Sequence, residues 1–197
     1  MRLVTQVHGV QVAVARRGDT GAWSRPQADI IVTDDPDVAI GVRVADCVPV
    51  LLYDRVRRVA GAAHAGWRGT AADAAGAAVR ALHREFGSNA ADLIAAIGPC
   101  LGQCCGEVGP EVVEAFRTGA GARGGSVDVW FTPGSGDRFF LDLERANADQ
   151  LARAGMDPDR VSAAGLCTKT HHRRLHSYRA EGAAAGRLLG AIRIPSP

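Results

Sequence analysis

The sequence predicts an α/β domain in which the strands form mixed β-sheets, and three observations support this prediction. Short apolar runs that are typical of buried strands outnumber the helical patterns along the chain. Several neighbouring runs are separated by only a few turn-forming residues, so they can pair as hairpins rather than through long crossovers. The chain has 197 residues, of which 47% are hydrophobic, and this suits one globular domain with a substantial core.

The first part of the chain contains three predicted strands. Alternating valines over 10–14 predict a half-buried strand that begins soon after His8. Apolar runs at 30–32 and 39–44 predict two more strands, and the sequence D-D-P-D at 34–37 predicts the turn between them.

The next two apolar runs, at 48–53 and 59–63, predict a β-hairpin closed by the charged turn 54–58. Cys47 directly precedes the first run, and His64 directly follows the second. The start of one strand of an antiparallel hairpin lies beside the end of the other, so we expect these two side chains to meet. A thiolate and an imidazole brought together there can bind a metal or act as a nucleophile and its base.

The residues after His64 predict a glycine-containing loop and then a helix. Thr70 is the predicted N-cap residue, with Asp73 in the capping-box position. Apolar residues then repeat at helical spacing until Gly87 ends the pattern. The N-terminus of this helix would offer free N–H groups and a partial positive charge beside His64, which favours a bound anion.

The rest of the chain predicts further strands and helices separated by glycine-rich loops. The predicted strands lie at 93–97, 127–131, 139–141 and 161–164 and near 192–194. A helix over 111–116 is predicted behind Pro110, and another is predicted to follow the N-cap residue Asp142 and to end at Gly155.

Composition and charge exclude several classes of partner. The formal net charge of +2 and the scattered arginines do not form a nucleic-acid-binding pattern. No apolar run approaches the ~20 residues that a membrane-spanning helix needs. We therefore expect neither nucleic acid nor a membrane as a partner. The five cysteines, without a secretion signal, favour reduced thiols and a cytoplasmic location.

Four of these cysteines have no role that their spacing assigns. The pattern C-x-x-x-C-C formed by Cys100, Cys104 and Cys105 has no nearby histidine and fits no common zinc motif. Small buried loop residues are the simpler interpretation. The role of Cys167 is equally open.

Five motifs occur in order along nearly the whole chain. They are Q-V-H-G at 6–9, A-D-C-V-P-V-L-L-Y-D at 45–54, H-A-G-W-R-G-T at 64–70, I-G-P-C-L-G-Q-C-C-G-E-V-G at 97–109, and S-Y-R at 177–179 followed by G-R at 186–187. Together they resemble the multicopper polyphenol oxidoreductase or laccase-domain family, also known as YfiH-type or peptidoglycan editing factor proteins.

This resemblance implies a layered α/β/β/α sandwich of mixed sheets, similar to the catalytic domain of cytotoxic necrotizing factor toxins. It also implies a Zn²⁺ site formed by His8, Cys47 and His64. Family members usually carry a substantial segment before Q-V-H-G, so we expect a single domain over 1–197 that lacks this segment. Oligomers larger than a weak homodimer are not expected, and a monomer is equally compatible.

The resemblance further implies an enzyme, namely a zinc-dependent purine nucleoside phosphorylase that acts on adenosine, inosine and methylthioadenosine and also deaminates adenosine. The partners would then be a nucleoside and phosphate. Three protein ligands leave a fourth position for water, and zinc lowers the pKa of such a water toward ~7, which provides hydroxide for deamination at C6 of adenine. Phosphorolysis instead requires phosphate held against the ribose C1′.

The candidate catalytic residues are Cys47, His64 and Arg68, and Arg68 is expected to hold the phosphate beside the helix. The candidate substrate-binding residues are Arg43, Trp67 and Arg179, with Arg187 as a weaker candidate. Asp46 either orients a ligand histidine or caps a turn.

Three alternatives stay open or are disfavoured. The first is a zinc-free hydrolase that edits peptidoglycan precursors, with Cys47 as nucleophile and His64 as base. The second is a partner-binding scaffold without activity. A copper polyphenol oxidase is disfavoured because such enzymes use about ten histidines in H-x-H pairs, whereas this chain has six histidines and no such pair.

Overall fold

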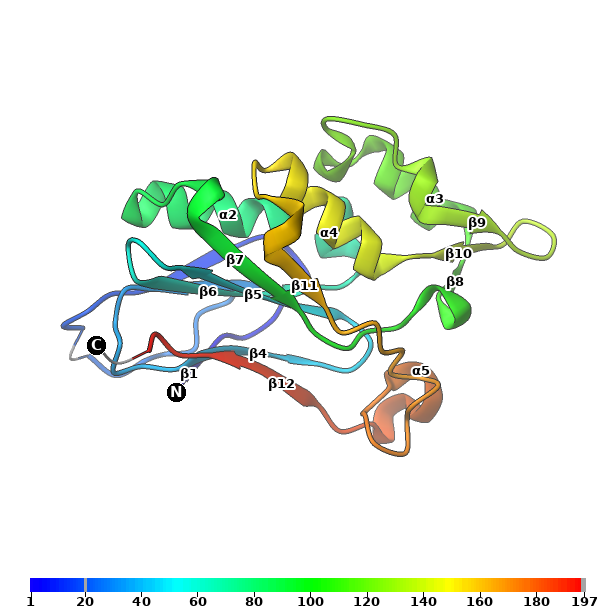
Figure 1. Ribbon diagram of the computed structural model, residues 1–197. Coiled ribbons are helices and arrows are strands. Elements are labelled where there is room, and N and C mark those ends of the chain that lie inside the picture. Colours follow the sequence, from blue (N-terminus) through cyan, green and yellow to red (C-terminus); the bar gives the residue numbers. More distant parts are fainter. Residues whose placement is uncertain (20, 196–197) are drawn as a thin grey trace.

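Two β-sheets lie face to face at the centre of the protein, in a computed structural model that describes residues 1–19 and 21–195 (Figure 1). The larger sheet has six strands in the order β11 (Val161–Ala163), β7 (Leu93–Ile97), β5 (Val48–Asp54), β6 (Val59–Ala65), β3 (Ile30–Thr33) and β2 (Val12–Ala15). The smaller sheet has the order β1 (Arg2–Leu3), β4 (Ile40–Val44) and β12 (Leu188–Ile192). Both sheets contain parallel and antiparallel pairs, which confirms the predicted mixed α/β fold.

Helices cover the face of the larger sheet that points away from the smaller one (Figure 1). The α-helices on this side are α1 (Trp67–Ala71), α2 (Ala74–Phe86), α3 (Pro110–Thr118) and α4 (Leu143–Arg153), whereas α5 (Tyr178–Glu181) lies beyond the end of β12. Short 3₁₀ turns lie at Ala90–Asp92, Gln103–Cys105, Ala120–Ala122, Asp128–Trp130, Pro158–Arg160 and Gly182–Ala184. A third sheet with the order β8 (Glu107–Val108), β10 (Phe139–Leu141) and β9 (Phe131–Pro133) lies beside α3.

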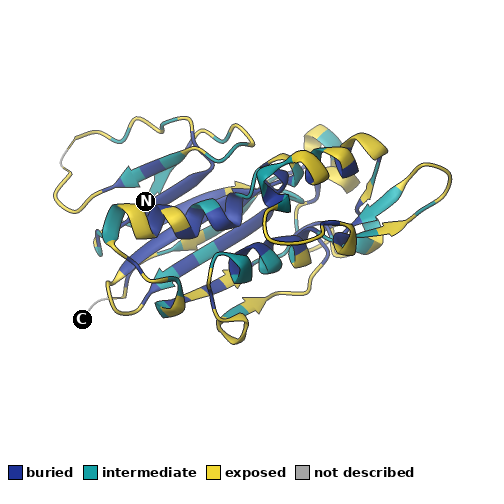
Figure 2. Ribbon diagram, turned by 90° about the horizontal axis from the view of Figure 1, so that it is seen from above, coloured by how far each residue is buried: buried dark blue, intermediate teal, exposed yellow. Residues whose placement is uncertain are grey.

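Two separate apolar cores result from these layers, and β3 contributes to both. Ile30 and Val32 pack into the core under the helices, whereas Ile31 packs into the core between the two sheets. Successive strand residues point to opposite faces, so a strand covered on both faces must be apolar throughout. This explains why all four residues of β3 are buried. The strands at the centre of the molecule are largely dark blue in Figure 2.

The predicted hairpin of β5 and β6 forms the middle of the larger sheet. The two strands pair antiparallel, and the register sets Pro49 opposite His64 and Val48 opposite Ala65. This register confirms the predicted pairing and brings Cys47, just before β5, to the same end of the sheet as His64.

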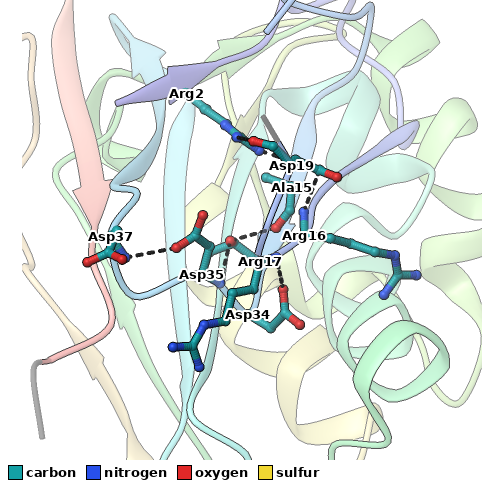
Figure 3. A network of polar contacts seen from close by, with 9 residues as sticks. Arg2, Ala15, Arg16, Arg17, Asp19, Asp34, Asp35 and Asp37 are labelled. Carbon is teal, nitrogen blue, oxygen red and sulfur yellow. Dashed lines mark hydrogen bonds and ion pairs between the residues drawn. The ribbon is translucent and has the colours of Figure 1, made fainter. Parts of the chain in front are cut away.

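A network of polar contacts closes the opposite end of the larger sheet (Figure 3). The Thr33 hydroxyl donates to the carbonyl of Ala15 over 2.7 Å and accepts the backbone N–H of Asp35 over 3.0 Å. The backbone N–H of Arg17 donates to Asp34 over 2.7 Å. These bonds fix the ends of β2 and β3, so the two ends of the sheet differ in character: this one is held by side-chain bonds to the backbone, and the other carries Cys47 and His64.

The expected N-cap at Thr70 is wrong. The chain turns into α1 already at Trp67, with Gly66 as the N-cap residue, and the hydroxyl of Thr70 accepts a hydrogen bond from Nδ2 of Asn147 over 3.1 Å. Asp73 precedes α2 in the left-handed region at φ 70° and makes no capping bond. The end of the helix at Gly87 is confirmed.

Two predicted strands are displaced. The residues Asp128–Trp130 form a 3₁₀ turn instead of a strand, because the fully buried Trp130 turns its indole inward and donates to Asp149 over 2.6 Å. The last strand is Leu188–Ile192 rather than 192–194, because it pairs with β4 in the register that sets Ile192 opposite Ile40. The helix α5 was not predicted.

The order of layers is α/β/β in the described part of the chain. The four-layer expectation also required helices on the outer face of the smaller sheet, and among residues 1–19 and 21–195 none lies there (Figure 1). Exposure alternates along β12, where Leu189 is 47% exposed, so its outer face stays open in these residues. No helix among the described residues has the length and apolar character that a bilayer crossing requires.

Candidate metal centre and active site

Three side chains from distant parts of the chain meet at one end of the β5–β6 hairpin. The ligand atoms of His8, Cys47 and His64 all lie within 4.8 Å of one another. The register of the hairpin accounts for two of them, and the loop before β2 supplies His8. The structure thus brings together all three residues of the expected zinc site.

The loop that carries His8 is held by a carboxylate. Asp29 is fully buried, and it accepts the backbone N–H groups of Val7, His8 and Gly9 over 3.2, 2.9 and 2.7 Å. His8 itself lies in the left-handed region at φ 62°, a conformation that costs a non-glycine residue about 1–3 kcal/mol. The three hydrogen bonds offset this strain and fix the imidazole at the site.

The same carboxylate orients the second histidine. Nδ1 of His64 lies 2.7 Å from Oδ1 of Asp29, so Nδ1 carries a proton and donates it, and Nε2 is the nitrogen that can bind a metal once it is deprotonated. Burial raises the pKa of Asp29, but His64 and the loop N–H groups lower it by more, so the net pKa is lowered. Sequence reasoning missed Asp29, and the only signal was its position directly before the apolar run at 30–32.

The thiol and the imidazole perturb each other in the absence of a metal. Burial raises the pKa of Cys47, but hydrogen bonds and charge from His64 and His8 outweigh it and lower this pKa to about 7. Burial lowers the pKa of His64, but Asp29 and Cys47 raise it to about 9. Between these values the pair is a thiolate beside an imidazolium.

The donor set fits a metal ion. Two imidazoles and one thiolate are ligands that Zn²⁺ prefers, and three protein ligands are typical of a site with an open position. The backbone approaches closely enough to exclude a side chain at Gly66, where an added Cβ would lie 2.8 Å from Sγ of Cys47 and 3.4 Å from Cδ2 of His8. Gly66 therefore keeps the space between the two ligands free.

A cavity of about 750 Å³ opens in front of this group. Arg43, Trp67 and Arg179, the three expected substrate-binding residues, line it together with Arg25 and Arg187. Four arginines at one cavity favour an anionic or strongly polar ligand. Sequence reasoning missed Arg25, which lies at φ 52° in a loop that carries no recognisable motif.

Arg68 occupies a different position from the other arginines. It does not occur among the described residues that line the cavity, and its guanidinium instead stacks on the indole of Trp67, 4.1 Å from the ring centroid. Because Trp67 does line the cavity, this stacking contact links Arg68 to a residue of the cavity wall.

Of the two roles considered for Asp46, the structure supports the capping of a turn, here the first turn of α5. Its carboxylate accepts the hydroxyls of Thr168 and Ser177 over 2.5 and 2.7 Å and the backbone N–H of Arg179 over 2.5 Å. Asp46 lies at φ 83° next to Cys47, so it ties the C-terminal loop to the residue that carries the thiolate.

Arg179 links this loop to a second one. Its guanidinium Nη1 donates to the carbonyls of Cys105 and Glu107 over 3.1 and 3.2 Å. The guanidinium is therefore fixed by backbone acceptors before any ligand binds, which reduces the entropy lost on binding.

Fold and site together define a mixed α/β protein with a His/Cys/His centre in an arginine-lined cavity. Residues 1–195 match the family described as multi-copper polyphenol oxidoreductase laccase, and the chain belongs to this family. It is similar to a protein named purine nucleoside phosphorylase from Bacteroides thetaiotaomicron, with 36% identity over 84% of this chain and 60% of the relative. The chain thus spans less than two thirds of that relative's length.

Two further comparisons agree with this assignment. A protein named adenosine deaminase RL5, from an unknown prokaryotic organism, is 35% identical over 83% of this chain and 61% of its own length. The crystal structure of the hypothetical protein YfiH from Bacillus licheniformis superposes with a TM-score of 0.91 at 32% identity, and the match covers 98% of this chain and 74% of that one.

Proposed function

We propose that the protein is a zinc-dependent purine nucleoside phosphorylase that also deaminates adenosine. The observation that carries this proposal is the convergence of His8, Cys47 and His64 on a cavity lined by four arginines. The names of two relatives supply the reaction class. The cavity volume of about 750 Å³ lies within the ~300–1,000 Å³ of small-molecule sites.

His8, Cys47 and His64 would hold the ion, and Asp29 would keep Nε2 of His64 free for it. A bound Zn²⁺ would act as a Lewis acid and lower the pKa of a water at the site. The chain's own contribution to catalysis is then orientation of the nucleoside and exclusion of bulk water from the cavity.

The arginines would bind the phosphate, and Trp67 would pack against the purine. Arg43 and Arg179 line the cavity directly, and the fixed guanidinium of Arg179 suits bidentate binding of an anion. Arg68 remains a proposed catalytic residue: its contact with Trp67 would let it add positive charge at the edge of the phosphate site. Adenosine, inosine and methylthioadenosine are the proposed substrates.

A cytoplasmic location fits this proposal. The five cysteines are all free thiols in the structure, as expected in a reducing compartment. A monomer or weak homodimer remains the proposed oligomeric state.

Metal analysis combined with a product assay tests the proposal. The purified protein is expected to hold zinc and to convert adenosine plus phosphate into adenine and ribose 1-phosphate, and adenosine alone into inosine. The variant Cys47→Ala should lose both the zinc and the products, whereas the control Cys100→Ala, which removes a buried thiol outside the site, should keep them. Stoichiometric zinc without either product would sink the proposal.

A second candidate function rests on one observation, the lowered pKa of Cys47 beside His64 and Asp29. Cysteine, histidine and aspartate in hydrogen-bonded sequence also form the arrangement of a thiol hydrolase, which would act on an amide such as a peptidoglycan precursor. Iodoacetamide treatment separates the two functions. Full protection of Cys47 by one equivalent of zinc, with turnover only in that state, favours the phosphorylase, and amide hydrolysis by the zinc-free protein favours the hydrolase.

A further inference from the structure

A second group of three sulfur atoms lies outside the cavity. The Sγ atoms of Cys104, Cys105 and Cys167 are all within 4.8 Å of one another, and those of Cys104 and Cys105 are 3.7 Å apart. None of the three belongs to the described residues that line the cavity. Their meeting is a consequence of topology, because β7 and β11 pair in parallel and the loops that follow leave the sheet at the same end.

The loops after β7 and β11 stay together beyond the sheet. The backbones of Cys100 and Cys167 pair as an isolated parallel β-bridge, and both thiols are free. The backbone N–H of Thr168 donates to the carbonyl of Cys100 over 2.8 Å. Gly102 then passes against the sulfurs: an added Cβ there would lie 3.0 Å from Cβ of Cys167 and 3.6 Å from Sγ of Cys104. A residue larger than glycine would therefore push the thiols apart.

One of the three thiols, that of Cys167, has a lowered pKa. Burial raises the pKa of Cys167, but hydrogen bonds from the backbone N–H groups of Thr170 and Gly102 and from the Thr170 hydroxyl outweigh it and lower this pKa to about 7. Desolvation by the surrounding loops and the neighbouring sulfurs of Cys105 and Cys167 raise the pKa of the exposed Cys104 to about 11. A cation between the three sulfurs would displace the remaining thiol protons and offset the repulsion between the thiolates that form.

We propose that Cys104, Cys105 and Cys167 form a second metal site that binds a thiophilic cation, Cu⁺ or Zn²⁺. Thiolates without an imidazole or carboxylate partner are the ligands that such soft ions prefer. A metal–sulfur bond of ~2.3 Å in a tetrahedral site sets the sulfurs about 3.8 Å apart, close to the 3.7 Å between Cys104 and Cys105. Small movements of the loops would bring Cys167 to the same separation.

An ion at this site would stabilise the loops that form the wall of the cavity. Cys105 accepts the guanidinium of Arg179 through its carbonyl, and Cys167 is followed by Thr168, whose hydroxyl donates to Asp46. Linking the two loops through a metal would therefore restrict the movement of the residues that hydrogen-bond Arg179 and Asp46. The ion itself would take no part in the reaction in the cavity.

The experiment uses the variant Cys47→Ala, because this variant has no thiolate in the first centre. The reduced protein is titrated without oxygen, once with Cu⁺ against a competing chelator and once with Co²⁺ as a spectroscopic substitute for Zn²⁺. Retention of one equivalent of Cu⁺, or thiolate-to-cobalt charge-transfer absorption at one equivalent, supports the second site and identifies the ion. The test does not depend on nucleoside turnover, so it is separate from the proposed function.

Two additional substitutions and a matched control make the result specific. Cys104 is exposed, so Cys47→Ala/Cys104→Ser should fold normally and lose the bound ion. Cys167 is buried, so serine is chosen there for its similar size, and Cys47→Ala/Cys167→Ser should also lose the ion. Cys47→Ala/Cys100→Ala removes a neighbouring thiol outside the group and should keep the ion. Equal binding by the Cys104 variant, loss of binding in the Cys100 control, or a disulfide among the three thiols with no ion taken up would overturn the proposal.

Discussion

The two sulfur centres have thiols of similar acidity that arise from different surroundings. Hydrogen bonds and charge from two imidazoles lower the pKa of Cys47 to about 7, whereas N–H and O–H donors of two loops lower the pKa of Cys167 to about 7. Cys100, which is buried beside both loops, has a raised pKa because burial and nearby carboxylates disfavour its thiolate. The donors around a thiol, and not the degree of burial, thus decide whether it is ready to bind a metal.

The difference in ligand atoms would suit the two proposed centres to ions with different roles. The centre of Cys47 faces a cavity and contains imidazoles, which suits an ion with an open position for water or substrate. The centre of Cys167 has sulfur alone and lies between loops, which suits an ion with a structural role. Substitutions at each centre test whether the two centres are independent in this way.

The largest expected effect on turnover comes from replacing the thiol of one centre at a time by a hydroxyl. Cys47→Ser should reduce purine nucleoside turnover by more than about 100-fold, because loss of a direct metal ligand exceeds the 10–100-fold cost of losing a residue that orients one. Cys167→Ser should leave turnover within a few-fold of the original protein. Initial rates with adenosine and phosphate measure both, and equal losses in the two variants would show that the centres are one functional unit.

Replacement of Asp29 should have the next largest effect. In Asp29→Asn the amide can no longer accept both the His64 Nδ1 proton and the loop N–H groups as a carboxylate does, so zinc affinity should fall about 10–100-fold. Competition with a zinc chelator measures this change. The matched control is Asp35→Asn, a buried aspartate at the other end of the sheet, which should leave the affinity unchanged.

The contrast between Asp29 and the hairpin shows what the sequence could reveal. The pairing of β5 and β6 was predictable because its two apolar runs and their turn are adjacent in sequence. The place of His8 in the site came from the resemblance to a family and not from its spacing. Asp29 could not be recognised, because an acid before an apolar run is also typical of an ordinary turn.

Contacts between distant loops were beyond sequence reasoning for a related reason. The spacing of Cys104 and Cys105 carries no sign of Cys167, which reaches them only through the parallel pairing of β7 and β11. Likewise, Thr70 and Asp73 fit a capping box by type, but a buried contact with Asn147 draws Thr70 into α1. Local patterns predicted the elements, and long-range packing decided which side chains meet.

The pH dependence of alkylation tests the origin of the two low pKa values. In the metal-free protein, the rates at Cys47 and Cys167 should both rise with pH through about 7, because only the thiolate reacts and it forms above the pKa. In His64→Ala the rise at Cys47 should move to higher pH, whereas that at Cys167 should stay near 7. Mass spectrometry of the alkylated peptides measures each site, and a parallel shift of both would contradict separate origins.

The smallest expected effect comes from removing one hydrogen-bond donor beside Cys167, the counterpart of His64→Ala beside Cys47. Thr170→Val keeps the shape of an exposed side chain but removes the hydroxyl, which lowers the pKa of Cys167 and also donates to the Cys167 carbonyl over 3.1 Å, while both backbone N–H donors remain. One hydrogen bond to a charged group contributes about 1.5 kcal/mol, so the pKa of Cys167 should rise by about one unit or less. Alkylation of Cys47 in the same sample is the internal control and should not change. A pKa of Cys167 that does not move would assign the stabilisation of its thiolate to the backbone N–H groups alone.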